Sequence, residues 1–132
     1  MTLNLEYHYH EAGFNGSQWN NFFNVGRSNV FASNQFWYTQ AFASDQQEPM
    51  SRQEIFARVS WNDAFIQKLQ LSAFTFINLY DGSTSSQAAA TYYLNDAWTV
   101  GALVGANLGG TSSEHGSALQ AVSGILQVVR YF

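Results

Sequence analysis

The sequence predicts an all-β fold: an antiparallel transmembrane β-barrel, or a segment of one, to which the chain contributes six to eight strands. Segments of alternating apolar and polar residues, the signature of strands, recur along the chain. Charged residues make up only 11% of the chain and aromatic residues 17%, whereas about 25% of an average soluble domain is charged. Strands that are apolar on one face only, in a protein poor in charge, are typical of outer-membrane barrels.

Composition also excludes several classes of protein. The chain has no apolar run long enough for a transmembrane helix, and the absence of cysteine excludes disulfides and thiolate metal sites. A net charge of −4 gives no basic surface for nucleic acid. The start, MTLNLEYHYH, lacks the features of a signal peptide, so we expect a mature chain with an added Met or a segment of a longer protein.

The first predicted strand, 2–10, alternates without a break. Leu3, Leu5, Tyr7 and Tyr9 fall on one face, and the positions between them are polar. Titratable side chains face lipid only at a high cost in free energy, so we expect the polar face to line the lumen. The same reasoning along the chain predicts these lumen-facing residues as a possible pore lining: Glu6, His8, His10, Glu54, Arg58, Lys68 and Gln70.

Residues 11–50 break the alternation and are predicted to form a long extracellular loop within a single domain, 1–132. Ser17 is a candidate N-cap for a short helix, because Trp19, Phe22 and Phe23 follow at helical spacing. Asn34 is a candidate cap for a second short helix. The alternative is that 34–44 forms a further strand.

Five further strands are predicted after this loop. Their apolar positions recur at every second residue, although Phe74, Phe76 and Leu103 fall on the polar side. The connections alternate in length: long at 11–50, 81–86 and 109–117, and short at Asn62-Asp63 and Asn95-Asp96. Outer-membrane barrels have short periplasmic turns and longer external loops in this order. The predicted strands are 51–62, 66–80, 87–95, 98–108 and 118–132.

Aromatic residues gather near the short turns and the carboxy terminus. WNDAF (61–65) and LNDAW (94–98) form a short internal repeat, in which Asn-Asp suits a tight turn. Amphipathic rings at such positions suit the membrane interface. We therefore predict an interface girdle, rather than a ligand cage, made of Trp61, Phe65, Trp98, Tyr131 and Phe132.

From Ile66 onward the chain resembles the carboxy-terminal part of uncharacterised, porin-like outer-membrane barrels of proteobacteria. The resemblance rests on NLYDGS (78–83), YYLNDAWTVGALVGANLGG (92–110), SEHGS (113–117) and the terminal VVRYF, and LEYHYHEAG (5–13) is similar to an earlier strand. It implies a location in the outer membrane of Gram-negative bacteria, with the lipid bilayer and the barrel-insertion machinery as partners. The terminal Phe132 is similar to the signal read by that machinery, although Gln127 and Arg130 depart from its pattern.

Two groups of titratable residues invite a chemical interpretation. Glu6, His8 and His10 offer ligands for zinc or copper, but a hydrated lumen wall explains them more simply, and we predict no metal and no cofactor. Glu114 and His115, with a neighbouring serine, offer a hydrolase site. Nothing in the sequence supplies an oxyanion hole, so we predict that the protein is not an enzyme.

Together these observations predict a passive channel or a structural barrel, in which lumen residues filter by size and charge. Six strands are fewer than the eight of the smallest single-chain barrels, and an open sheet in lipid leaves unsatisfied edges. We therefore expect other barrel chains to close the barrel, or the chain to be a fragment, or further strands within 11–50. The alternatives are a soluble lipocalin-like barrel that binds an apolar ligand and, as a lesser alternative, an outer-membrane hydrolase.

Overall fold

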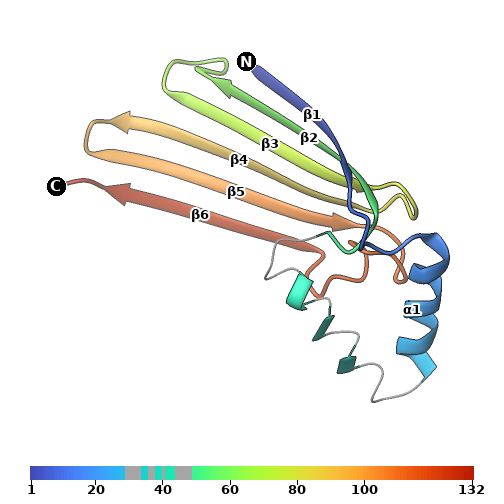
Figure 1. Ribbon diagram of the computed structural model, residues 1–132. Helices are drawn as coiled ribbons and strands as arrows, with labels where there is room; N and C mark the ends of the chain where they lie inside the picture. Colours follow the sequence, from blue (N-terminus) through green and yellow to red (C-terminus); the bar gives the residue numbers. More distant parts are fainter. Residues whose placement is uncertain (29–33, 36–37, 40, 44–48) are drawn as a thin grey trace.

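The fold is one antiparallel sheet with a helix at one end (Figure 1). The computed structural model describes residues 1–28, 34–35, 38–39, 41–43 and 49–132. Neighbouring strands in the sheet are also neighbours in the chain, which makes the sheet a meander. The predictions of an all-β antiparallel fold and of six strands are therefore confirmed. The elements are β1 (Thr2–Tyr9), α1 (Gly16–Ser28), β2 (Gln53–Asn62), β3 (Leu69–Asn78), β4 (Thr84–Asn95), β5 (Trp98–Leu108) and β6 (Val122–Arg130).

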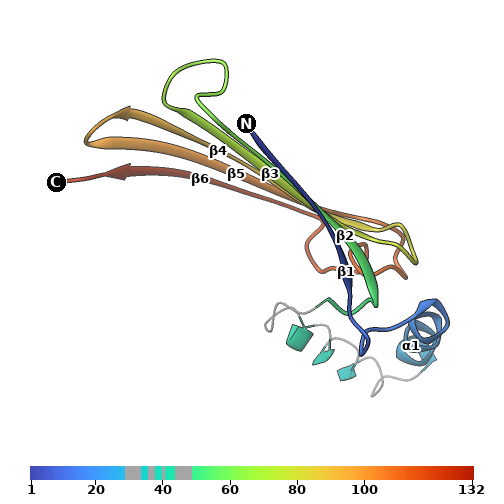
Figure 2. The ribbon, with the colours of Figure 1, turned by 45° about the horizontal axis from the view of Figure 1, so that its top comes forward.

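The sheet is open, so the six strands of this chain do not close into a barrel by themselves. β1 pairs only with β2, and β6 pairs only with β5, which leaves one free edge on each within the described part of the chain. Two views show a single twisted layer whose first and last strands lie apart (Figures 1 and 2). The twist of this sheet does not bring β1 and β6 together, and six strands are fewer than the eight of the smallest outer-membrane barrels.

The register gives the sheet two chemically different faces, as the alternation predicted. One row runs from Leu5 on β1 through Ala57, Thr75, Ser86 and Ala106 to Val122 on β6. We call the face that carries this row the apolar face. The opposite face, which carries Glu6 beside Phe56 and Phe56 beside Phe76, we call the polar face.

Two of the predicted connections differ from the structure. The β2–β3 connection is not the tight turn Asn62-Asp63 but spans 63–68, and the β3–β4 connection spans 79–83, so loop length does not alternate as regularly as predicted. Asp63, Phe65 and Lys68 have positive φ, and the Asp63 carboxylate accepts the Lys68 N–H at 2.8 Å, which stabilises the wider turn. The β4–β5 connection is tight, as predicted, and leaves only 96–97 between the strands.

Helix α1 begins after Asn15 rather than at the predicted cap, Ser17. The Gln18 N–H donates to Asn15 Oδ1 at 3.0 Å, and the Asn15 N–H donates to Gln18 Oε1 at 3.0 Å, a reciprocal capping box. Of the second predicted helix, 34–44, the described residues are helical and the others lie outside the described part of the chain. None of the described helices is long and apolar enough to cross a membrane.

The small hydrophobic core lies at the end of the sheet that carries α1, not on either face. Trp19 and Phe23 are buried there and pack with Phe14, Phe22 and Met50. Phe14 forms a parallel bridge with Ser51, which holds the start of α1 against the start of β2. Among the described residues, the largest buried rings therefore lie beside the loops, and no second layer of helices or strands covers the sheet.

Candidate functional site

The apolar face carries almost no charge. Among its strand positions in all six strands the only charged residue is Arg130, the last residue of β6. The Arg130 guanidinium lies 4.6 Å from the centre of the Phe132 ring and 5.4 Å from that of Trp98. The positive charge of Arg130 is thus at the margin of the sheet, where the guanidinium packs on two aromatic rings.

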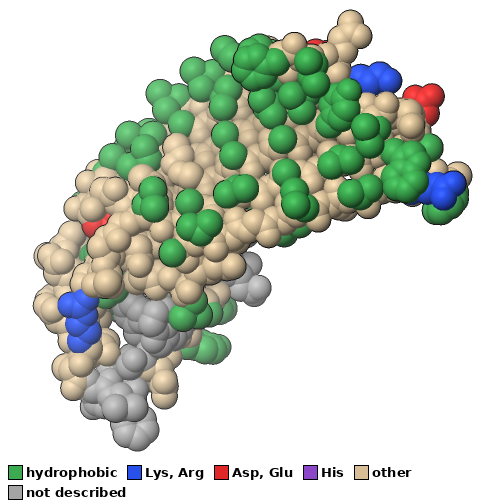
Figure 3. All heavy atoms as spheres, turned by 180° about the vertical axis from the view of Figure 1, so that it is seen from behind, with side chains coloured by type: hydrophobic (Ala, Val, Ile, Leu, Met, Phe, Trp, Pro, Cys, Tyr) green, Lys and Arg blue, Asp and Glu red, His purple; other side chains and the backbone are tan. Residues whose placement is uncertain are grey.

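The apolar face is also largely uncovered. Leu3 is 70% exposed, Leu5 73% and Leu126 86%. Figure 3 views the molecule from the side opposite to Figure 1 and shows this face. Hydrophobic side chains are spread over the sheet, and the charged side chains lie at its margins. Monomeric soluble proteins rarely expose apolar patches of this extent, so the face is suited to contact with a partner or with lipid.

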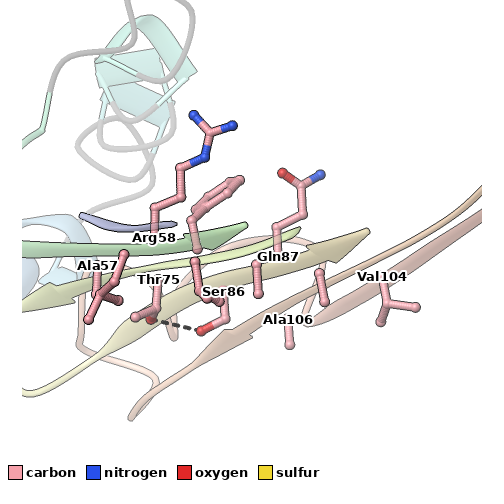
Figure 4. Close-up of a pocket in the computed structure, with 12 residues that line it drawn as sticks. Ala57, Arg58, Thr75, Ser86, Gln87, Val104 and Ala106 are labelled. Atoms are coloured by element: carbon pink, nitrogen blue, oxygen red, sulfur yellow. Dashed lines mark hydrogen bonds between the residues drawn. The ribbon is translucent and has the colours of Figure 1, made fainter. Parts of the chain in front are cut away.

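A shallow hollow of about 410 Å³ lies over the middle of the apolar face. Small side chains form its floor, among them Ala57, Thr75, Ser86 and Ala106. Thr75 and Ser86 satisfy each other through a hydrogen bond of 2.9 Å between their hydroxyls. In Figure 4 these side chains point away from Arg58 and Gln87, which project from the opposite face. The hollow therefore offers an apolar, hydrogen-bond-saturated surface.

The polar face gathers most of the residues predicted to line a lumen. Glu6, His8, Glu54, Arg58 and Gln70 share it by register, and the remaining two predicted residues lie in connections. His8 Nε2 is 3.0 Å from the Glu6 carboxylate. Three rings accompany these polar groups, because Phe56, Phe74 and Phe76 stack on this face at centroid distances of 4.8–6.1 Å.

His10 and Lys68 are the two exceptions. His10 follows β1 and donates its backbone N–H to Arg52 O at 2.9 Å, while Lys68 ends the β2–β3 connection. A metal site on Glu6, His8 and His10, which we considered less probable than a lumen wall, is not assembled: among the described residues the only group of three metal-ligating side chains lies elsewhere.

That group is a buried cluster at the loop end of the polar face. It consists of Glu54 at the start of β2 and Glu114 and His115 in the β5–β6 connection, 109–121, whose ligand atoms lie within 4.8 Å of one another. Glu54 is 4% exposed and Glu114 8%. His115 Nε2 lies 3.7 Å from Glu54 Oε1.

Glu114 ties three separate segments together. Its Oε1 accepts the Met50 N–H at 2.9 Å, and its Oε2 accepts an amide N–H of Asn78 at 2.8 Å. Its own backbone N–H donates to Asp81 Oδ2 at 2.8 Å. Because Asn78 and Glu54 both lie on the polar face, the 109–121 connection folds over the end of that face and not over the apolar one.

His115 is held beside Glu114 by its backbone. Its N–H donates to Ser83 Oγ at 3.2 Å. Burial lowers the pKa of the His115 imidazole, although the nearby carboxylates of Glu114 and Asp81 oppose that shift. The hydroxyls of Ser113 and Ser117 donate to the carbonyls of Gly110 and Glu114, hydrogen bonds that close turns within the connection.

The five aromatic residues of the predicted girdle lie at the opposite end of the sheet. Trp61 and Phe65 flank the start of the 63–68 connection with ring centroids 4.7 Å apart. Trp98 begins β5, and Tyr131 donates its N–H to Ala97 O at 2.8 Å. With Phe132, whose ring lies under the Arg130 guanidinium, these rings lie at the end of the sheet that carries the 63–68 and 96–97 connections.

Sequence reasoning named every member of the loop-end cluster but did not bring them together. Glu54 was assigned to the lumen wall, and Glu114 and His115 to an external loop. The start of β2 and the β5–β6 connection fall at the same end of a meander, which is a signal the sequence does contain. The hydrogen bonds from Asn78 and Met50 to Glu114 have no signal in the sequence, because they depend on how the 109–121 connection folds back onto the sheet.

No protein family, curated protein or solved structure matches this chain. The interpretation of its function therefore depends on the geometry described above.

Proposed function

We propose that this chain is part of an outer-membrane β-barrel that acts as a passive channel or a structural barrel, with the apolar face toward lipid and the polar face toward the lumen. The observation that carries the proposal is the segregation of charge. The strands place Glu6, His8, Glu54 and Arg58 on one face, and the other face carries only Arg130, at its margin. Lipid-facing strand positions tolerate charge only near the interface.

The way the connections pack supports the same orientation. The 109–121 connection folds over the polar face through Glu114, which accepts a hydrogen bond from Asn78. The Arg27 guanidinium at the end of α1 donates to Ser112 in that connection. A loop folded across the end of the lumen would narrow a pore, while the uncovered apolar face meets acyl chains.

The free edges of β1 and β6 require additional strands in this proposal. Unpaired backbone N–H and C=O groups in hydrocarbon cost several kcal/mol each. A second copy of the chain, or further strands of a longer polypeptide, would pair with both edges and close the barrel. Either source keeps the assignment of the two faces unchanged.

The proposal is tested by recovering the protein in detergent, measuring the mass of the protein–detergent complex, and recording current across a planar bilayer. We expect the protein to require detergent and to form a species that contains more than one chain or a longer chain. A porin-like channel gives stepwise conductance, and a structural barrel inserts without it. Recovery as a monodisperse species in buffer without detergent would contradict the proposal.

One observation favours a second candidate, a soluble barrel that binds an apolar ligand. The hollow on the apolar face is lined by Ala57, Ala73 and Val104 among others, a surface suited to a small apolar molecule. In such a barrel the apolar face turns inward and the polar face meets water. Binding of a fluorescent fatty acid by detergent-free protein would support this candidate and exclude the membrane assignment.

A further inference from the structure

The buried cluster at the loop end carries ligand atoms for one cation. Glu54, Glu114 and His115 each offer one ligand atom, all within 4.8 Å of one another. Both carboxylates are at least nine-tenths buried. Two carboxylates this close repel each other, and the burial of uncompensated charge is costly.

No described cation offsets this negative charge. Both ion pairs among the described residues involve a histidine rather than Lys or Arg. Arg52, which lies close in sequence, donates its Nε–H to the carbonyl of Gly13 at 3.2 Å. Asp81 brings a third carboxylate to the cluster through the Glu114 N–H. Burial and the neighbouring Glu114 raise the pKa of Glu54 to about 7, so the cluster calls for a bound proton or a bound cation to offset its charge.

One polar atom at the cluster, His115 Nε2, is buried without a hydrogen-bond partner in the described part of the chain. The His115 nitrogen faces Glu54 Oε1 at 3.7 Å, too far for a hydrogen bond. Because buried polar atoms are almost always satisfied, this nitrogen favours a ligand bound at this point.

We propose that Glu54, Glu114 and His115 bind one divalent transition-metal ion of the Zn²⁺ class. Imidazole nitrogen with carboxylate oxygen suits Zn²⁺, whereas Mg²⁺ and Ca²⁺ prefer oxygen ligands alone. Two ligand atoms bound to one zinc ion at near-tetrahedral angles lie about 3.5 Å apart, close to the 3.7 Å between His115 Nε2 and Glu54 Oε1. Three protein ligands leave a fourth position for water.

The bound ion would join the start of β2 to the 109–121 connection. Asn78, whose amide donates to Glu114 Oε2, would fix the orientation of that carboxylate as an outer-shell partner. The site needs only the loop end as it is folded here. It is therefore independent of which face of the sheet meets lipid, and it can fail or hold separately from the proposed function.

The test uses the full chain without an affinity tag, stripped with a chelator and titrated with Zn²⁺ against a chromophoric chelator. We expect one Zn²⁺ per chain and no competition from Mg²⁺ or Ca²⁺. His115→Gln and Glu54→Gln are expected to weaken binding at least about tenfold, because even outer-shell changes cost 10- to 100-fold. Glu11→Gln, which alters an exposed carboxylate outside the cluster, is the matched control for Glu54→Gln and should leave affinity unchanged.

Absence of Zn²⁺ binding by the wild-type chain, or unchanged affinity in His115→Gln, would overturn the proposal. A second measurement needs no variant: X-ray absorption of the zinc-loaded wild-type protein counts imidazoles around the ion. One imidazole with oxygen ligands supports the cluster. Two or more imidazoles would contradict the site proposed here, which holds a single histidine.

Discussion

At the scale of single residues, Glu114 shows how one side chain can organise a loop end. Its two carboxylate oxygens accept N–H groups from Met50 and Asn78, and Asn78 is 1% exposed. A buried donor that loses its acceptor pays a desolvation cost that no other interaction offsets. Glu114 therefore contributes to stability through the donors it satisfies, whatever else the cluster binds.

We expect Glu114→Ala to lower the free energy of unfolding by about 1–3 kcal/mol for each donor left unsatisfied. Urea unfolding of metal-free protein, followed by tryptophan fluorescence, measures the change. Glu11→Ala removes an exposed carboxylate and should alter stability little. Equal stability of the two variants would show that Glu114 does not anchor the connection.

At the scale of elements, the start of α1 depends on Asn15 and Gly13. Asn15 caps the helix in a reciprocal pair with Gln18, while Ser17 donates its hydroxyl to Asn15 Oδ1 at 2.8 Å. Gly13 lies against the backbone of Ser51, where an added Cβ would lie 2.6 Å from the carbonyl carbon. The helix is thus fixed by one cap and one close backbone approach.

Replacing the cap should destabilise α1 specifically. We expect Asn15→Ala to cost about 1 kcal/mol and to speed amide hydrogen exchange in the first turn of the helix. Ser17→Ala removes only the hydroxyl that supports the cap and should have a smaller effect. Faster exchange in Ser17→Ala than in Asn15→Ala would restore Ser17 as the cap.

The close approach at Gly13 should tolerate no side chain. We expect Gly13→Ala to destabilise the protein by about 1–3 kcal/mol, because the methyl group would force the bridge between Phe14 and Ser51 apart. Gly16→Ala is the matched control, since its Cβ would meet only a ring atom of Tyr80 at 3.5 Å, an ordinary contact. Thermal unfolding compares the two, and a Gly13→Ala midpoint equal to that of Gly16→Ala would contradict the expectation.

At the scale of the whole molecule, the described part of the chain forms a single-layered sheet, and one face of it is largely uncovered and carries no charged strand residue except Arg130 at its margin (Figure 3). A sheet in water normally buries one face against another layer, and the largest buried rings, Trp19 and Phe23, lie beside the loops instead. The free edges of β1 and β6 extend along whole strands. Lipid would cover the apolar face, and added strands would pair with the free edges of β1 and β6.

Leu126 and Gln127 are adjacent in β6 but lie on opposite faces of the sheet, so substitutions at the two positions distinguish the proposed lipid side from the proposed lumen side. We expect Leu126→Arg, in the middle of the apolar side of β6, to reduce folding stability in lipid by about 2–4 kcal/mol, the cost of a cation near the bilayer midplane. Gln127→Arg, on the polar face, should be nearly neutral. Refolding into vesicles of phosphatidylcholine measures both, and equal yields would argue against the proposed orientation.

The sequence by itself determined the strands and their faces, because an alternation of period two survives in any sheet. It placed Leu3 and Leu5 opposite Glu6 and His8 and located all six strands to within about four residues, although β4 begins at Thr84, inside the predicted 81–86 loop, and β6 begins only at Val122. It predicted too short a turn at the 63–68 connection, because Phe65 and Lys68 have left-handed backbone there and these residue types do not normally signal that conformation. Only the tertiary structure decided that Glu54, Glu114 and His115 meet. Their meeting follows from contacts between segments far apart in the chain, whose geometry no local pattern encodes.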